Sequence, residues 1–187
     1  MSDTTAATAS PPGVSAIEPA VYPMAPLIRS TLIALYLALV LPLPVLAPEG
    51  LQAVMTAAVP AGLVLILALV SEQVELDATG LRVGHPAWCR WLLRRGWQLR
   101  WDQVSGLMPV GTSQGGRVFY VRTSQGGAYL LPQRVARFEQ FLQHVSQASG
   151  LDLADVGRIS PPWTYQLLAG LCWLFLAVEL TWLALRA

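Results

Sequence analysis

The chain has 187 residues, of which 54% are hydrophobic and only 12% are charged. Soluble proteins carry roughly 25% charged residues, so much of this chain is expected to lie out of contact with water. The net charge of +1 gives no support to a general role in binding polyanions such as nucleic acid.

The first 26 residues are rich in Ala, Ser, Thr and Pro and show no hydrophobic period. Such a segment cannot bury enough apolar surface to offset the entropy lost on ordering, so residues 1–26 are predicted to be a flexible tail. A cleaved signal peptide ending near Ala47 is the alternative. No basic residue precedes Arg29, and Pro48 follows the small-residue site, so a retained anchor is favoured.

Two apolar runs follow, over residues 27–47 and 51–70, separated only by Pro48-Glu49-Gly50. Each is close to the ~20 residues that a helix needs to cross the hydrocarbon core of a bilayer. A break this short forces the helices to lie antiparallel. Residues 27–70 are therefore predicted to form a transmembrane helical hairpin.

A third apolar run, over residues 163–187, follows a predicted linker at residues 151–162. It contains Glu179, whose carboxylate is costly inside a membrane and should face protein, water or the interface. Two interpretations stay open. Glu179 either reaches outward to the interface or stays protonated, with no role, or it is a functional intramembrane group.

Arginine sets the expected orientation of these three spans. The segment between the second and third spans holds ten of the chain's twelve basic residues: Arg82, Arg90, Arg94, Arg95, Arg100, Arg117, Arg122, Arg134, Arg137 and Arg158. Because positive residues favour the cytoplasmic side, the tail and this segment are predicted to be cytoplasmic. The expected location is the bacterial inner membrane, or the thylakoid in a cyanobacterium.

Residues 71–150 carry the patterns of a small β-rich domain. Residues 73–84 alternate around a turn at 77–80, and residues 97–101 alternate again, with 104–110 expected to extend that strand. Two copies of Thr-Ser-Gln-Gly-Gly, at 112–116 and 123–127, are predicted loops at either end of one strand. Residues 128–131 follow as a further strand.

From about Gln133 the hydrophobic period changes to that of a helix. The apolar positions Val135, Phe138, Phe141, Leu142 and Val145 share one face, and Gly150 is placed to end the helix. A strand meander with one closing helix is predicted, with about six strands.

Two resemblances follow from these residues. The stretches Val74-Glu-Leu-Asp-Ala-Thr-Gly-Leu-Arg-Val83, Leu99-Arg-Trp-Asp-Gln-Val-Ser-Gly106 and Tyr129-Leu-Leu-Pro132 resemble bacterial membrane-anchored pleckstrin-homology-like (PH-like) domains. That resemblance implies a small barrel that binds or scaffolds at the membrane. The hairpin-plus-domain layout is similar to the photosystem I assembly factor of cyanobacteria and chloroplasts, but the chain lacks the stretches typical of that family and adds a third span.

Catalytic and metal sites are not indicated. Residues 111–118 have the glycine spacing of a phosphate-binding P-loop, but Arg117 and Val118 replace the lysine and the hydroxyl residue that it needs. His85, His144 and the two cysteines lack ligand spacing around them. The sequence predicts no catalytic, cofactor or metal-binding residue.

The segment from His85 to Trp97 interleaves tryptophan with arginine. This mixture suits contact with lipid headgroups or a partner, since indole rings favour the interface and arginine binds phosphate. The alternative is an insert whose tryptophans cover the barrel. The candidate surface comprises Trp88, Arg90, Trp91, Arg94, Arg95 and Trp97.

The expected function is that of a non-enzymatic integral membrane protein. Its PH-like domain would bind lipid or a protein partner, as an accessory, scaffold or assembly factor of a larger membrane complex, photosynthetic if the second resemblance holds. The alternative is a small oligomeric transport or channel component that uses Glu179.

Overall fold

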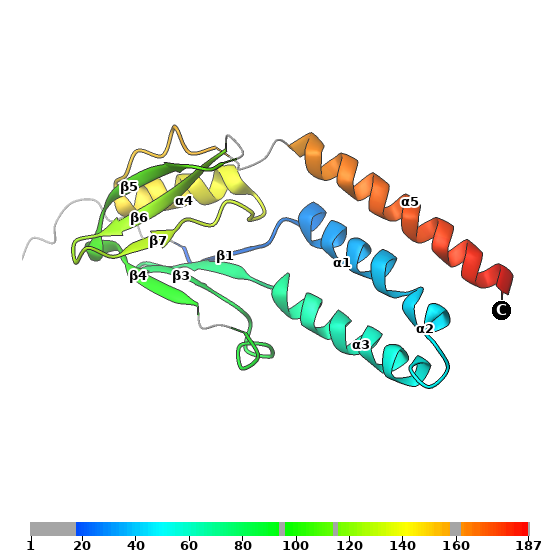
Figure 1. The fold of residues 1–187 in the computed structure, drawn as a ribbon. Coiled ribbons are helices and arrows are strands. Elements are labelled where there is room, and N and C mark those ends of the chain that lie inside the picture. Colours follow the sequence, from blue (N-terminus) through cyan, green and yellow to red (C-terminus); the bar gives the residue numbers. More distant parts are fainter. Residues whose placement is uncertain (1–17, 94–95, 114–115, 158–161, 187) are drawn as a thin grey trace, which may run out of the picture.

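A computed structural model describes residues 18–93, 96–113, 116–157 and 162–186. Three long helical segments extend from one end of a β domain (Figure 1). Arg94 and Arg95 of the candidate surface lie outside the described residues.

The helical part consists of α1 (Pro26–Val40), the short α2 (Leu43–Leu46), α3 (Gln52–Leu69) and α5 (Pro162–Arg186). Within the described part of the chain, three segments are long and apolar enough to span a membrane, namely Pro26–Leu46, Gln52–Leu69 and Trp163–Leu185. The predicted hairpin corresponds to the first two. α1 ends just before Pro42, because a proline nitrogen cannot donate the hydrogen bond that would continue the helix.

Small side chains allow these helices to approach one another. α1 packs along α5, and the buried residues Thr31, Ala34 and Ala38 leave little side-chain bulk on this face of α1. Toward α3, the Tyr36 hydroxyl donates a 2.6 Å hydrogen bond to the carbonyl of Val59. A Cβ atom at Gly62 would collide with the Tyr36 hydroxyl, so a larger residue there would displace the Tyr36 side chain and its hydrogen bond to Val59.

The β domain contains two antiparallel sheets and a closing helix. The first sheet has the order β1-β2-β3-β4, from β1 (Ala20–Pro23), β2 (Gln73–Leu76), β3 (Gly80–Gly84) and β4 (Trp97–Arg100). The second has the order β5-β6-β7, from β5 (Val104–Gly111), β6 (Arg117–Thr123) and β7 (Ala128–Leu130). Helix α4 (Phe138–Ser149) follows the second sheet.

Strand β1 precedes the first spanning helix, inside the range assigned by sequence to the flexible tail. It pairs with β2 in the register Tyr22↔Val74, and Tyr22 is 2% exposed in the core. The prediction of a flexible segment is therefore wrong for residues 20–23. This strand also brings the number of strands among the described residues to seven, one more than the sequence indicated.

The alternation at residues 97–110 does not form one strand. A 3-10 turn at Trp101–Gln103 separates β4 from β5, and the chain passes there from the first sheet to the second. The turn is held by the Gln103 side chain, which accepts from the backbone N–H of Arg100, and by a two-point contact of Arg100 with Asp102. The prediction that residues 104–110 extend the strand at residues 97–101 is therefore wrong.

The repeated pentapeptides form equivalent loops at the two ends of β6, as predicted. In each copy the threonine N–H donates to the carbonyl of the last glycine at 2.8 Å, from Thr112 to Gly116 and from Thr123 to Gly127. Each threonine hydroxyl also accepts a hydrogen bond from the N–H of that glycine. Gln114 and Gly115 lie outside the described residues.

Helix α4 buries the predicted apolar face, with Phe138, Phe141, Leu142 and Val145 in the same core as the sheet residues. Val135 is also buried, but it precedes the helix and forms an isolated bridge with Met24. Gly150 ends the helix with a φ of 69°, a conformation that glycine adopts without steric penalty. Leu153 and Val156 of the predicted linker join the core.

Candidate membrane-facing site

An insert, residues 85–96, connects β3 to β4 and is anchored at the end of a spanning helix. Cys89 is 1% exposed, and its Sγ lies 3.2 Å from the Oγ of Ser71. Ser71 comes directly after the last turn of α3. The buried cysteine therefore fixes the insert at the junction between the β domain and α3.

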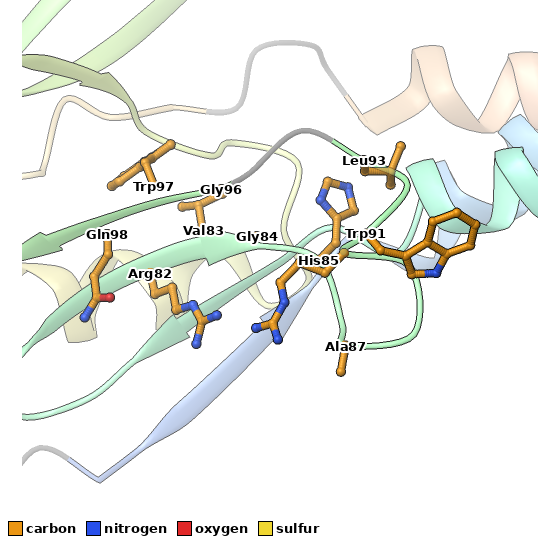
Figure 2. A pocket seen from close by; sticks show the side chains of 11 residues that line it. Arg82, Val83, Gly84, His85, Ala87, Trp91, Leu93, Gly96, Trp97 and Gln98 are labelled. Atoms are coloured by element: carbon orange, nitrogen blue, oxygen red, sulfur yellow. The ribbon is translucent and has the colours of Figure 1, made fainter.

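The insert exposes large apolar side chains at this junction. Trp91 is 81% exposed and Trp88 is 53% exposed, with Leu92 beside them in the sequence and also exposed. The Trp91 indole N–H donates a 2.9 Å hydrogen bond to the carbonyl of Trp88. This bond fixes the Trp91 ring relative to the backbone of Trp88. In Figure 2, Trp91 lies on the side of the helices, away from Trp97 and Gln98.

Trp97 does not belong to this exposed group. It is half-buried on β4, and its ring stacks at a tilt on Tyr129 of β7, with the ring centroids 5.0 Å apart. Trp88 and Trp91 are exposed, as the surface interpretation requires, whereas Trp97 packs against the core of the β domain.

A cavity of about 700 Å³ lies between the insert and the edge of the first sheet. Figure 2 shows several of the side chains that line it. Arg82, Arg90, His85 and Gln98 supply polar groups, and Trp91 and Trp97 supply aromatic walls. Such a lining suits an anionic group held next to an apolar one.

Of these polar groups, Arg82 has a partner within the protein, whereas one nitrogen of His85 has none among the described residues. Arg82 is partly neutralised, because its guanidinium lies 3.5 Å from the carboxylate of Glu75 across the β2–β3 pair. The Nδ1 of His85 is buried and has no hydrogen-bond partner among the described residues.

A Cβ atom at Gly96 would collide with the carbonyl oxygen of Val83, so the insert can rejoin the sheet only through glycine.

Glu179 lies on the face of α5 that is turned toward its neighbours. Ala169, Cys172 and Leu176 are buried along this helix at helical spacing, and Glu179 continues the same stripe three residues later. Its Oε2 is buried and accepts no hydrogen bond from the described part of the chain. One oxygen of the carboxylate is therefore covered by the protein, although the residue as a whole is partly exposed.

Two other polar side chains, His144 and Asp77, have local structural partners. Nδ1 of His144 lies 2.7 Å from the Tyr22 hydroxyl, which joins α4 to β1. The carboxylate of Asp77 accepts hydrogen bonds within its turn, and these, with that of the Thr79 side chain first, lower its pKa. Within the described ranges, no group of three or more His, Cys, Asp or Glu residues is arranged to hold a metal ion.

The chain is similar in sequence to a known cyanobacterial protein. No protein-family model matches the chain, and no solved structure matches it. The chain is 46% identical over 154 residues to the uncharacterized protein slr0269 of the cyanobacterium Synechocystis sp. strain PCC 6803, an alignment that covers 79% of this chain and 77% of that protein. At this identity and coverage the two share a family: the chain belongs to the family of the Synechocystis protein slr0269.

Proposed function

We propose that this protein is a non-enzymatic, membrane-anchored adaptor whose PH-like domain rests on the membrane surface through the Trp88–Trp91 insert. The arrangement of four strands, three strands and one closing helix supports a PH-like barrel, because it is the layout of that fold. The role is that of an accessory, scaffold or assembly factor within a larger membrane complex.

The observation that carries the proposal is the exposure of Trp88 and Trp91 beside the end of α3. A helix that spans the bilayer ends near the headgroups, and tryptophan is enriched at that depth, since its ring is apolar and its N–H is polar. Arg90 is exposed in the same insert. An arginine near an anionic surface contributes ~1 kcal/mol, an effect that decays within a Debye length.

The proposed side is the cytoplasmic one, because the basic residues of the domain favour it. The relative in a cyanobacterium supports a thylakoid or inner-membrane location within that proposal. The faces of the β domain away from the insert then remain available to a protein partner.

Photo-cross-linking in the native membrane tests this proposal. A benzoylphenylalanine placed at Trp91 should give lipid adducts, whereas the same group at Gln125, in the loop after β6, should not. Extraction in mild detergent should retain the protein in an assembly heavier than its own oligomers. Protein adducts without lipid adducts at position 91 would contradict the surface contact, and a discrete homo-oligomer would contradict the adaptor role.

One observation favours a second candidate, a small oligomeric transport or channel component. The buried Oε2 of Glu179 lies on the same stripe of α5 as the buried Ala169, Cys172 and Leu176, and a carboxylate that is costly in such a place marks a candidate functional group. In that case Glu179→Gln would abolish ion or proton flux through reconstituted vesicles without altering the amount of folded protein. Flux that is absent from the unaltered protein would remove this candidate.

A further inference from the structure

Two arginines lie on the wall of the 700 Å³ cavity between the insert and the first sheet (Figure 2). Arg82 belongs to β3 and Arg90 belongs to the insert. Both residues are exposed, so their guanidinium N–H groups can reach a molecule that enters the cavity. A guanidinium donates two parallel hydrogen bonds to the oxygens of a phosphate, so these two side chains supply the donors that a phosphate needs.

Backbone hydrogen bonds hold Arg90 in place. Its N–H donates to the carbonyl of Pro86 at 3.1 Å, and the N–H of Leu93 donates to the carbonyl of Cys89 at 3.2 Å. The two turns that these bonds close enclose Cys89, which is buried and contacts Ser71 at the end of α3. The backbone of Arg90 is therefore fixed relative to the spanning helix.

The charge of the cavity favours an anion. No carboxylate occurs among the described residues that line it. Arg90 forms no ion pair within the described ranges, whereas Arg82 lies 3.5 Å from one carboxylate oxygen of Glu75. The other oxygen of Glu75 accepts a 2.8 Å hydrogen bond from Gln73. Among these groups, two arginines and one glutamate leave a single positive charge uncompensated, which suits a singly charged anion.

Gln98 adds a neutral polar group to the same wall. It is the partner of Arg82 across the β3–β4 pair, and Figure 2 shows both side chains projecting to the same side of the sheet. Its exposed amide offers both donors and an acceptor at the cavity. Gln98 can therefore bind a hydroxyl group that lies next to the anion.

The location of the cavity points to a lipid as the source of that anion. Trp91 lines the cavity and is 81% exposed, and Leu93 adds a further apolar side chain. The insert that carries them is fixed at the end of α3. A phospholipid at this depth presents its charged phosphate beside the start of its acyl chains, whereas a soluble anion would leave the apolar part of the wall unused.

We infer that this cavity binds one phospholipid that carries a single negative charge and a neutral, hydroxyl-bearing headgroup, as phosphatidylglycerol does. The phosphodiester accepts from Arg82 and Arg90, a headgroup hydroxyl pairs with Gln98, and the start of the acyl chains lies against Trp91. This inference rests on the proposed membrane contact of the insert and adds to it a bound lipid of defined chemistry. A zwitterionic lipid is disfavoured, because its ammonium group would meet the uncompensated positive charge.

The test uses the full chain in a neutral detergent, with phosphatidylglycerol and phosphatidylcholine of identical acyl chains. Native mass spectrometry counts the bound lipids and gives their affinities. We expect one phosphatidylglycerol molecule to bind about tenfold more tightly than phosphatidylcholine, and Arg90→Gln to weaken its binding about fivefold. Equal affinities of the unaltered chain for the two lipids would overturn the inference.

Arg122→Gln is the matched control. Arg122 is exposed on β6 and does not line the cavity, so this variant removes the same charge from another surface. It should change the affinity for phosphatidylglycerol by less than about twofold, since the charge is separated from the bound lipid and screened. An equal loss in Arg122→Gln and Arg90→Gln would mean that general surface charge attracts the lipid, and would contradict a site in the cavity.

Glycerophosphoglycerol, which is the headgroup without its acyl chains, distinguishes a lipid from a soluble phosphodiester. An excess of it should displace little of the bound phosphatidylglycerol, because it cannot pack against Trp91. Displacement at concentrations similar to that of the lipid would assign the cavity to a soluble ligand and overturn the inference. Lipid adducts from a photoreactive group at position 91, together with equal affinities for the two lipids, would leave the surface contact standing and contradict this inference alone.

Discussion

The Oγ of Ser71, one residue beyond the end of the α3 cap, lies 3.2 Å from the Sγ of Cys89 in the insert. This contact couples the position of Trp88 and Trp91 to a spanning helix. The depth of the two indoles is then set by the fold and does not require the insert to find the membrane by itself. The proposed contact of the insert with the membrane surface depends on this coupling.

A disulfide tests the contact directly. Ser71→Cys should oxidise readily with Cys89, since the side-chain atoms at these two positions already lie 3.2 Å apart. The product is detected as the loss of two hydrogen atoms in the intact mass. Glu72→Cys is the control, because the exposed Glu72 lines a cavity that includes no residue of the insert. Failure of the Ser71→Cys protein to cross-link would place the insert elsewhere.

Strand β1 is expected to be essential for the stability of the domain. Tyr22 is buried against Phe141, with the ring centroids 5.4 Å apart, and its hydroxyl contacts His144. Tyr22→Ala should lower the free energy of unfolding by ~3–5 kcal/mol, as is usual for a buried aromatic residue.

Val21→Ala provides the matched control, because Val21 is 48% exposed on the same strand and should change stability by less than ~1 kcal/mol. Chemical denaturation of the full chain in detergent measures both. A fragment that begins at residue 71 should fold poorly, since it lacks β1. Equal, small losses from both variants would mean that β1 is not part of the core.

The turn between β2 and β3 should make stability depend on pH. Oδ1 of Asp77 accepts from the hydroxyl of Thr79 at 2.6 Å, the N–H of Thr79 at 2.7 Å and the N–H of Gly80 at 2.9 Å. These bonds, the side-chain one first, lower the pKa of Asp77 below its usual value. A lowered pKa stabilises the fold above the unfolded-state pKa of ~3.9, and this contribution is lost as pH falls through the folded-state value.

Asp77→Ala should therefore lower the free energy of unfolding by about 1 kcal/mol at neutral pH and by much less once the carboxyl is protonated in both states. Asp77→Asn retains an acceptor oxygen but not the charge, so its loss at neutral pH should be smaller, and the stability of this variant should lack the part of the pH dependence that Asp77 supplies. Unfolding curves measured across the acid range provide the comparison. A loss from Asp77→Ala that is constant with pH would contradict this role.

The topology can be determined by labelling single cysteines from outside the cell. A cysteine placed at Glu49, in the loop between the first two spans, should react with an impermeant maleimide, whereas one placed at Gln125 should be protected until the membrane is opened. The native cysteines are both buried, so they contribute little background. Labelling of Gln125 with protection of Glu49 would reverse the orientation.

The parts of the fold that the sequence predicted are those set by local patterns. Apolar runs of spanning length, the Asp77 turn, the paired threonine–glycine loops and the amphipathic helix each depend on residues close together in the chain. Strand β1 could not be found in this way. It has only four residues, which follow Pro19 and end with Pro23, and its pairing partner lies about fifty residues away, beyond the first two spans.

The candidate site was predicted in part, for a related reason. Sequence spacing placed Trp88, Trp91 and Trp97 in one run, but only the register of β4 shows that Trp97 packs on Tyr129 instead of joining the surface. The role of Cys89 as an anchor depends on a contact with Ser71 that no local motif encodes.

The depth of Trp91 in the membrane is the most direct test of the account. A nitroxide at Trp91→Cys, with Cys172 replaced by alanine and the buried Cys89 retained, is compared with one at Gln125→Cys in the same nanodiscs. The label at position 91 should be relaxed more by oxygen and less by a water-soluble nickel chelate than the label at position 125, as expected at the headgroup layer. Equal relaxation of both labels by the nickel chelate, at the level seen in bulk water, would show that the insert does not contact the membrane.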